Sequence, residues 1–365
     1  MLVDESLIDN TRLLLAQRLQ LVDSRYVGLQ QIRQHDLKLI TNIKLLLKRE
    51  NSSELPAWFN WLDQDNVTPL DLADLDEFIN NDRAWLLLTE IKVLLQPTWL
   101  DEFIKAFQHN PEAEYSRLFW QLAARLQLKL NPFCFSQPLT GQALWYIVCS
   151  AQPQLQPELQ QLLIRLLPTD PLMVYTKMAL HSYNNGFNET ASNNKQSERF
   201  CELALISQLI KTEQLKPEHL MLLLISAPES KQTEIINYLI NNIATQSLAI
   251  LALAISGKAK FIALLLELAQ QADTSEEATD SLGCILGVIE ADSLLCDVNL
   301  LANLHLNANS KYLAGHTLNS TVLALVWQQG NQLQRRIAAC YARLADNNTY
   351  WREPDTLLGG AWHCQ

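Results

Sequence analysis

Residues 248–258 read Leu-Ala-Ile-Leu-Ala-Leu-Ala-Ile-Ser-Gly-Lys, an apolar run that stops at a small, glycine-containing turn. A second apolar run follows at once. The composition of the whole chain also favours helices, since its 365 residues include 71 leucines but only 11 valines and 10 glycines. Leucine is a good helix former, whereas valine and the other β-branched residues favour strands. The composition therefore predicts an all-α fold and argues against sandwiches, barrels and glycine-rich nucleotide-binding folds.

The helix–turn–helix pattern recurs from about residue 57 onward. Its later turns begin at Ile225, Ile255, Ile289 and Trp327, so successive turns are 30, 34 and 38 residues apart. A drifting period in the thirties is typical of degenerate helical-pair repeats, in which stacked neighbours share one continuous core. We therefore expect a curved, right-handed α-solenoid of about seven helical pairs. One or two irregular helical domains without a true repeat remain the alternative.

The pattern divides the chain into four segments. Residues 1–50 form an N-terminal segment of two helices, the second with an apolar stripe that includes Ile32, Leu39 and Ile43. Residues 57–183 are the first group of helical pairs, and 184–197 are a polar, exposed loop. Residues 198–365 are the second group, followed by a C-terminal tail.

Charge and hydropathy exclude several kinds of partner. The formal net charge is −11, whereas a nucleic-acid binder needs concentrated positive charge to displace counterions. The apolar runs 144–149 and 248–255 are far shorter than the roughly 20 residues that a helix needs to cross a bilayer. The acidic start Met1-Leu2-Val3-Asp4-Glu5 does not resemble a secretory signal. We expect a cytoplasmic protein that binds neither nucleic acid nor membrane.

No catalytic motif appears in the sequence. It has no GxSxG, GxxxxGK[ST] or HExxH, the patterns of nucleophile elbows, phosphate loops and zinc proteases. Cys296, His305 and His316 are too widely spaced for close zinc-ligand pairs. The run that starts at Asp63 has Thr68 where a calcium loop needs glycine. The seven cysteines contain no CxxC pair and favour buried thiols. No metal, no cofactor and no catalytic residue is predicted.

The clearest feature is the segregation of charge near the N-terminus. Between residues 10 and 49 only Asp23 and Asp36 oppose eight basic residues: Arg12, Arg18, Arg25, Arg33, Lys38, Lys44, Lys48 and Arg49. Residues 51–82 then hold eight acidic residues and no basic one: Glu54, Asp63, Asp65, Asp71, Asp74, Asp76, Glu77 and Asp82. The two segments could attract each other within the chain, could simply solvate its surface, or could form a docking surface.

The docking interpretation rests on the aromatic residues among these acids. Aromatic rings suit binding anchors, and an acidic rim would steer a basic partner. Phe59 or Trp85 is expected in the core, which leaves a tryptophan for the surface. The candidate partner-binding residues are Trp58, Trp61, Asp63, Asp65, Asp71 and Asp74.

A second acidic stretch lies between Lys260 and Lys311, where no lysine or arginine occurs. Its acidic residues are Glu267, Asp273, Glu276, Glu277, Asp280, Glu290, Asp292 and Asp297. Equivalent positions of successive repeats line one face of a solenoid. The stretch is either a groove for a basic ligand or a solvated outer face.

Two regions resemble an uncharacterised proteobacterial family of HEAT-like repeat proteins. The first, Leu13 to Leu47, carries Arg18, Asp23, Arg25-Tyr26 and His35-Asp36-Leu37. The second carries Lys311-Tyr312-Leu313-Ala314-Gly315 and then Gly330-Asn331-Gln332-Leu333-Gln334-Arg335-Arg336-Ile337-Ala338-Ala339. The Arg335-Arg336 pair is expected on the outer side of the last helix. Members of the family look like genomic neighbours of type VI secretion spike and tip components.

These observations predict a non-catalytic protein-binding adaptor or chaperone. The resemblance implies a spike-tip or effector protein of type VI secretion as its partner. The alternatives are a lyase-like or glycosylase-like enzyme that uses the concave face of the solenoid, and a self-assembling structural component.

Overall fold

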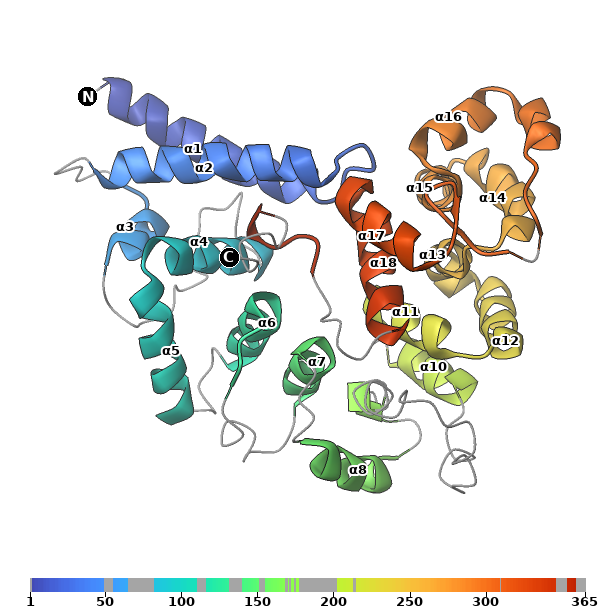
Figure 1. The fold of residues 1–365 in the computed structure, drawn as a ribbon, viewed down its shortest axis with the longest axis horizontal. Helices are drawn as coiled ribbons and strands as arrows, with labels where there is room; N and C mark the ends of the chain where they lie inside the picture. The colour runs from blue at the N-terminus through green and yellow to red at the C-terminus, as the bar shows by residue number, and fades with distance from the viewer. Residues whose placement is uncertain are drawn as a thin grey trace. The chain divides into compact units, whose positions relative to one another are not determined.

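The structure is a computed structural model. It describes residues 2–48, 55–64, 82–109, 116–130, 140–150, 155–167, 170, 172–173, 175–176, 202–212, 215–308, 310–345 and 353–358. These residues are mostly helical (Figure 1), and the strands among them are the short antiparallel pair β1 (Tyr312–Leu313) and β2 (His316–Thr317). The predicted all-α class is confirmed. Among the described helices, none has the length and apolar character needed to cross a membrane.

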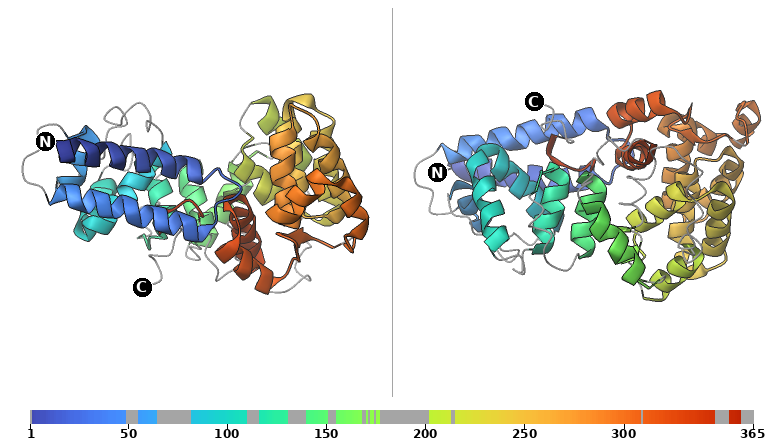
Figure 2. Two further views of the ribbon diagram at one scale, coloured as in Figure 1. Left: turned by 90° about the horizontal axis from the view of Figure 1, so that it is seen from above. Right: turned by 60° about the horizontal axis from the view of Figure 1, so that its bottom comes forward.

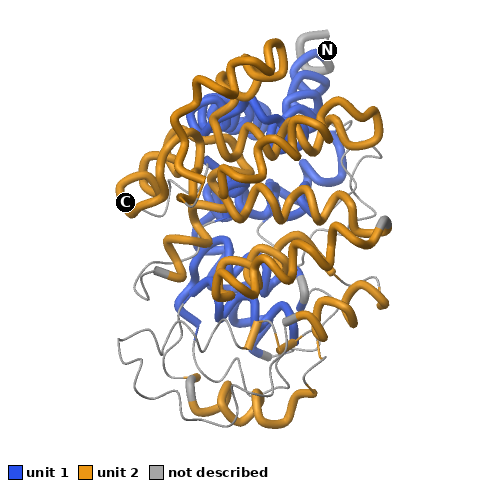
Figure 3. Tube along the Cα trace, turned by 90° about the vertical axis from the view of Figure 1, so that its right-hand side faces the viewer, with its two compact units in different colours: residues 1–150, 352–365 blue, residues 151–351 orange. Residues whose placement is uncertain are grey.

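The chain divides into two compact units (Figure 3). Unit 1 comprises Met1–Ser150 together with Arg352–Gln365, and unit 2 comprises Ala151–Trp351. The C-terminal end of the chain thus belongs to the same unit as its N-terminal helices, which the sequence did not indicate. The loop predicted at 184–197 lies outside the described residues.

Unit 1 is a set of packed helices. They are α1 (Leu2–Leu21), α2 (Leu29–Leu47), α3 (Ala57–Asp63), α4 (Asp82–Leu95), α5 (Pro97–His109), α6 (Ser116–Leu126) and α7 (Gly141–Ser150). Helices α1 and α2 lie side by side in all views (Figures 1 and 2), α4 packs against α5 and α6, and α6 packs against α7.

The two N-terminal helices follow the predicted pattern. On α2 the apolar side chains of Ile32, Leu39 and Ile43 are buried, while Lys38 and Lys44 are exposed. Apolar residues spaced by three or four positions place one stripe on one face of a helix, which packs against its neighbour.

The described part of unit 2 also consists mainly of helices. Its α-helices are α8 (Gln156–Arg165), α10 (Glu202–Lys211), α11 (Pro217–Ser226), α12 (Glu229–Ile240), α13 (Gln246–Ser256), α14 (Ile262–Ala269), α15 (Ser275–Leu286), α16 (Val288–Cys296), α17 (Ser320–Gln329) and α18 (Gln332–Ala345). Its 3₁₀ helices are η7 (Ile243–Thr245), η8 (Ala259–Phe261) and η9 (Val298–Asn303). Helix α13 packs between α11 and α15, and α15 also packs against α14 and α16.

Three helices of unit 2 keep a constant period. Helices α11, α13 and α15 end at Ser226, Ser256 and Leu286, so each end follows the previous one by 30 residues. The turn predicted at Ile289 is wrong, because Ile289 lies inside α16 and the chain turns at Gly287 instead. The period therefore does not drift over these pairs. In the sequence the period appears to drift because Ile289 lies four residues beyond Ile285, the position equivalent to Ile225 and Ile255.

Equivalent threonines repeat the same contact in two successive pairs. Thr245, just before α13, donates its hydroxyl to the Leu239 carbonyl at 2.9 Å. Thr274, just before α15, donates its hydroxyl to the Leu268 carbonyl at 2.7 Å. Both hydroxyls satisfy a carbonyl of the preceding helix end, which has no partner within its own helix.

Residues 311–315, which we call the strap, run across the ends of α13 and α15. The backbone hydrogen bonds are Tyr312 N–H to Gly257 O (2.7 Å), Ala314 N–H to Cys284 O (2.7 Å) and Gly315 N–H to Ile285 O (2.9 Å). The Lys311-Tyr312-Leu313-Ala314-Gly315 sequence is therefore a structural element that connects the ends of α13 and α15.

The second family-like sequence starts α18 with a reciprocal cap. The Asn331 N–H donates to the Gln334 side chain and the Gln334 N–H donates to the Asn331 side chain, each at 2.9 Å. The expectation that Arg335 lies on the outer side is wrong, since its side chain is fully buried. Its guanidinium lies 4.3 Å from the centre of the Trp327 ring and donates to the Trp327 carbonyl at 2.9 Å.

Candidate functional site

The predicted partner-binding residues are only partly within the described chain. Trp58 and Trp61 lie on α3 and are buried, with 1% and 6% of their surfaces exposed, while Asp63 at the end of α3 is exposed. Asp65, Asp71 and Asp74 lie outside the described residues. The docking interpretation required an exposed tryptophan, and neither Trp58 nor Trp61 is one in this structure. Phe59 and Trp85 are buried as expected.

A buried lysine explains why Trp61 faces inward. The Lys92 ammonium, on α4, lies 4.4 Å from the centre of the Trp61 ring. The same ammonium donates hydrogen bonds to the Trp61 carbonyl at 2.5 Å and to the Gln64 carbonyl at 2.6 Å. These carbonyls lie at the C-terminal end of α3, where the helix dipole favours a cation. The contact with the ring adds a cation–π attraction.

Trp61 continues into an aromatic core. Its ring meets Trp99 edge-on at 5.8 Å between centroids, and Trp99 stacks on Phe103 at 4.7 Å. Further contacts carry this cluster through Phe119 to Trp120. The aromatic residues among the acids are therefore used for packing within unit 1.

The basic N-terminal segment uses its own two aspartates. Asp23 forms an exposed ion pair with Arg83 of α4 at 3.0 Å. Asp36 lies on the buried stripe of α2, where it pairs with Arg18 of α1 at 2.5 Å. Among the described ion pairs of this segment, none joins it to the acidic stretch 51–82.

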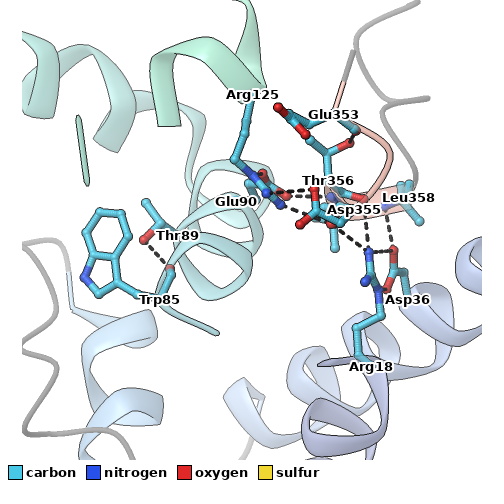
Figure 4. A network of polar contacts seen from close by, with 11 residues as sticks. Arg18, Asp36, Trp85, Thr89, Glu90, Arg125, Glu353, Asp355, Thr356 and Leu358 are labelled. Carbon is cyan, nitrogen blue, oxygen red and sulfur yellow. Dashed lines mark hydrogen bonds and ion pairs between the residues drawn. The ribbon is translucent and has the colours of Figure 1, made fainter. Parts of the chain in front are cut away.

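The Arg18–Asp36 pair forms half of a buried charge network that holds residues 353–358 (Figure 4). Arg18 donates from one guanidinium nitrogen to the carbonyls of Asp355 and Thr356, at 3.0 and 3.1 Å. Asp36 accepts the N–H of Leu358 at 2.7 Å. A pair formed between α1 and α2 therefore also binds the backbone of the distant C-terminal segment.

The other half comes from α4 and α6. Arg125 donates to one oxygen of the fully buried Glu90 at 2.5 Å, and the second oxygen accepts the Leu357 N–H at 2.5 Å. Arg125 also donates to the Asp355 carboxylate and to the Asp355 carbonyl, both at 3.1 Å. We call Arg18, Asp36, Glu90 and Arg125 the clamp.

The ionisation of the clamp is set by burial and by pairing. Burial raises the pKa of the Asp36 carboxyl and of the Glu90 carboxyl, and the neighbouring Arg18 and Arg125 guanidinium groups oppose that rise. Burial lowers the pKa of Arg125, but the Asp355 and Glu90 carboxylates outweigh this effect and hold the pKa above its usual value. Every charge of the clamp thus has an opposite charge in contact, as buried charges require.

A signal for the clamp was present in the sequence. Arg18 falls at helical spacing between the buried Leu15 and Val22, and Asp36 falls between the buried Ile32 and Leu39. A charged residue on an apolar stripe needs a buried partner. The sequence cannot say which residue that partner is, because it lies on another element.

Unit 2 carries a second candidate surface, on α16 and η9. Its apolar members are exposed: Ile289 by 78%, Val298 by 44% and Leu300 by 37%. Glu290 on α16 and Asp297, the residue between α16 and η9, are also exposed. Helix α16 packs against η9, so these side chains belong to one part of the molecule. We call these five residues the α16–η9 surface.

Lysines gather at the start of α12. Lys258 is buried and its ammonium pairs with Glu229 at 2.5 Å, while Lys311 donates to the Gln232 side chain at 3.3 Å. Burial lowers the pKa of Lys311, and the nearby Lys258 lowers it further. The hydrogen bond from Lys258 lowers the pKa of Glu229. These contacts connect the strap and the α13 end to α12.

The described cysteines fall into two groups. Cys149, Cys284 and Cys340 are buried thiols, as predicted, whereas Cys296 is exposed on α16. Burial raises the pKa of the Cys284 and Cys340 thiols. Among the described residues, no group of three or more His, Cys, Asp or Glu side chains is arranged to hold a metal ion.

Comparison of the chain with known protein families, curated proteins and solved structures gave no match.

Proposed function

We propose that the protein is a non-catalytic protein-binding adaptor and that its partner binds the α16–η9 surface. The observation that carries the proposal is the exposure of Ile289, Val298 and Leu300 beside exposed carboxylates. Apolar side chains that face water and are rimmed by polar residues are typical of protein-interaction sites.

Charge defines the chemistry of the partner. The described stretch around α16 carries acidic residues without a lysine or arginine between Lys260 and Lys311. Such a surface attracts a partner with basic side chains and accelerates its association. The partner would therefore offer an apolar group flanked by lysine or arginine.

The repeated helices support a solenoid as the scaffold for this surface. The constant spacing of the α11, α13 and α15 ends and the direct packing of these helices on one another are features of stacked helical pairs. Each pair then contacts mainly its neighbours. An α-solenoid of HEAT-like pairs is our proposal for unit 2.

The resemblance at residues 311–315 and 330–339 suggests a biological setting. On that basis alone, we propose that the partner is a spike-tip or effector protein of type VI secretion. Both sequences serve the structure of unit 2, where they form the strap and the start of α18. The resemblance therefore supports a shared fold more strongly than it supports a shared partner.

The proposal is tested by affinity capture from the native cell with the full chain as bait. Ile289→Asp should reduce capture of the main partner at least about tenfold, because a charge replaces an exposed apolar anchor. Ile240→Asp is the matched control, since Ile240 is another exposed isoleucine of unit 2, on α12. If both variants capture the partner as well as the parent does, the α16–η9 surface is not the binding site.

A second arm addresses charge. The double variant Glu290→Lys/Asp297→Lys should weaken capture and should reduce its dependence on salt, whereas Glu158→Lys on α8 should not. The four candidate partner-binding aspartates of the N-terminal region are tested in parallel by changing Asp63, Asp65, Asp71 and Asp74 to lysine. Loss of capture in that variant alone would move the binding surface to unit 1.

A further inference from the structure

We propose that the clamp of unit 1 is a peptide-binding site and that residues 353–358 occupy it as an exchangeable ligand. The ligand class is a short peptide turn with an aspartate followed, two positions later, by a pair of leucines. The proposal is independent of the α16–η9 surface, which lies in the other unit and has the opposite charge preference.

The clamp contacts mostly backbone atoms of residues 353–358. Arg18 contacts the carbonyls of Asp355 and Thr356, and the two carboxylates accept the N–H groups of Leu357 and Leu358. Arg33 adds a hydrogen bond to the Leu358 carbonyl at 3.2 Å. Every peptide carries these backbone groups, so a segment of another molecule could make the same contacts.

Two side-chain contacts make the site selective for particular peptide sequences. Arg125 contacts the Asp355 carboxylate at 3.1 Å, and the Leu357 side chain is fully buried. An arginine favours a carboxylate among the side chains that could reach it. The site therefore selects an acidic residue followed at the second position by an apolar residue.

The two ion pairs of the clamp are formed by residues outside the bound segment. The Arg18–Asp36 pair joins α1 to α2, and the Arg125–Glu90 pair joins α6 to α4. Neither pair includes a residue of 353–358. The binding groups are thus fixed by contacts within the first 150 residues, and such preorganisation lowers the entropy cost of binding.

The buried carboxylates of the clamp need hydrogen-bond donors from a bound segment. Without the segment, Glu90 and Asp36 would each lose an N–H donor while they stay buried. Unsatisfied buried groups, charged ones especially, are costly. The chain supplies the occupant from beyond unit 2, because residues 353–358 follow Ala151–Trp351. Covalent attachment keeps its effective concentration high.

Residues 353–358 form a turn that is held by hydrogen bonds within the segment. The Thr356 hydroxyl donates to the Glu353 carbonyl at 3.0 Å, and the Thr356 N–H points to the same carbonyl at 3.4 Å. Pro354 restricts the backbone between them. A free peptide of this sequence would therefore lose little conformational freedom on binding.

The test uses the full chain with a protease site inserted after residue 348, cut after folding. The probe is a synthetic peptide, Glu-Pro-Asp-Thr-Leu-Leu, capped at its C-terminus and labelled with a fluorophore at its N-terminus. Fluorescence anisotropy should show saturable binding to the cut protein. Binding to the uncut protein should be at least about tenfold weaker, because the tethered segment competes.

Variants of the peptide and of the protein define the contacts. The peptide with the Asp355→Ala change should bind at least about tenfold more weakly, since it loses the charged hydrogen bond to Arg125. A peptide of reversed sequence should not bind. On the protein, Arg33→Ala removes only the exposed contact to Leu358, so it leaves the fold in place and should weaken binding severalfold.

Three results would overturn the proposal. The cut protein could retain its own segment and take up no labelled peptide, or it could bind the reversed peptide equally well. It could also lose its helical circular dichroism on cutting, in which case 353–358 is a fixed part of the fold and no ligand.

Discussion

The N–H of Leu357 donates a hydrogen bond to the Glu90 carboxylate across 267 positions of sequence. The other oxygen of this carboxylate accepts from Arg125, so one buried side chain joins α4, α6 and the end of the chain. Residues that follow the whole of unit 2 in the sequence therefore make buried contacts within unit 1.

Replacing Glu90 by alanine should destabilise the protein by about 3–5 kcal/mol, because it leaves Arg125 buried with one partner fewer. Chemical denaturation followed by circular dichroism measures the free energy of unfolding. The matched control is Asp23→Asn, which removes a carboxylate from the exposed Arg83 pair. An exposed pair contributes roughly 0–1 kcal/mol. Equal losses for the two variants would show that the clamp does not stabilise unit 1.

Gly257→Ala should destabilise unit 2 by roughly 1–3 kcal/mol. Gly257 has a positive φ of 64°, and a Cβ there would lie 2.6 Å from the Tyr312 carbonyl oxygen of the strap. A positive φ strains a residue that carries a side chain. Thermal unfolding by calorimetry measures the loss.

Gly283→Ala is the control for that experiment. A Cβ at Gly283, inside α15, would meet its nearest neighbour, a Val288 methyl group, at 3.6 Å. Alanine favours a helix over glycine by about 0.5–1 kcal/mol. We expect unchanged or slightly higher stability for this variant. A large loss would show that an added methyl group alone destabilises unit 2, so that the loss at Gly257 could not be attributed to its positive φ.

His35 should make the protein sensitive to mild acid. In the described part of the chain neither of its buried ring nitrogens has a hydrogen-bond partner. Burial lowers the pKa of His35, Arg18 and Lys38 lower it further, and Asp36 opposes them. The unfolded chain then binds a proton before the folded chain does. The free energy of unfolding therefore falls as the pH drops below about 6.5.

His35→Leu tests this effect. Denaturation midpoints measured from pH 8 to pH 5 should decline less steeply in the variant than in the parent. Parallel curves for the two proteins over that range would show that His35 keeps its ordinary pKa in the fold.

Thiol reagents should distinguish the described cysteines. Cys296 is exposed, whereas Cys149, Cys284 and Cys340 are buried, and a thiol must reach solvent as a thiolate to react. In a variant with Cys134, Cys201 and Cys364 changed to serine, one thiol should react within minutes and three only after denaturation. Mass spectrometry of the labelled peptides identifies them, and early labelling of Cys284 or Cys340 would contradict the packing of unit 2.

The sequence was most informative where one helix face determines the structure. The stripe with Ile32, Leu39 and Ile43 on α2 was predicted and is buried. In the sequence, the charged Asp36 within that stripe is one of two acidic residues among eight basic ones. Its actual partner, Arg18, could not be identified from spacing, because the pairing depends on how α1 packs against α2.

The expectation of an exposed tryptophan near the acidic residues also depended on contacts that are distant in sequence. Trp58 and Trp61 stand beside acidic residues, and that neighbourhood suggested exposure. The Lys92 ammonium, which covers Trp61 and the end of α3, lies 31 positions away. A contact of that range leaves no local pattern. The α16–η9 surface shows the opposite case, since Ile289 is predicted to begin a turn and is instead exposed on helix α16.

The strap has a consequence for how the protein could change in length. Its backbone reaches from Gly257 to Ile285 and so spans one interval of the 30-residue period. A duplicated unit inserted between α13 and α15 would move these acceptors apart, and five residues could no longer reach both. The hydrogen bonds of residues 311–315 therefore require the present spacing between the ends of α13 and α15. A helical pair could be gained or lost without breaking these bonds only outside the segment from α13 to α15.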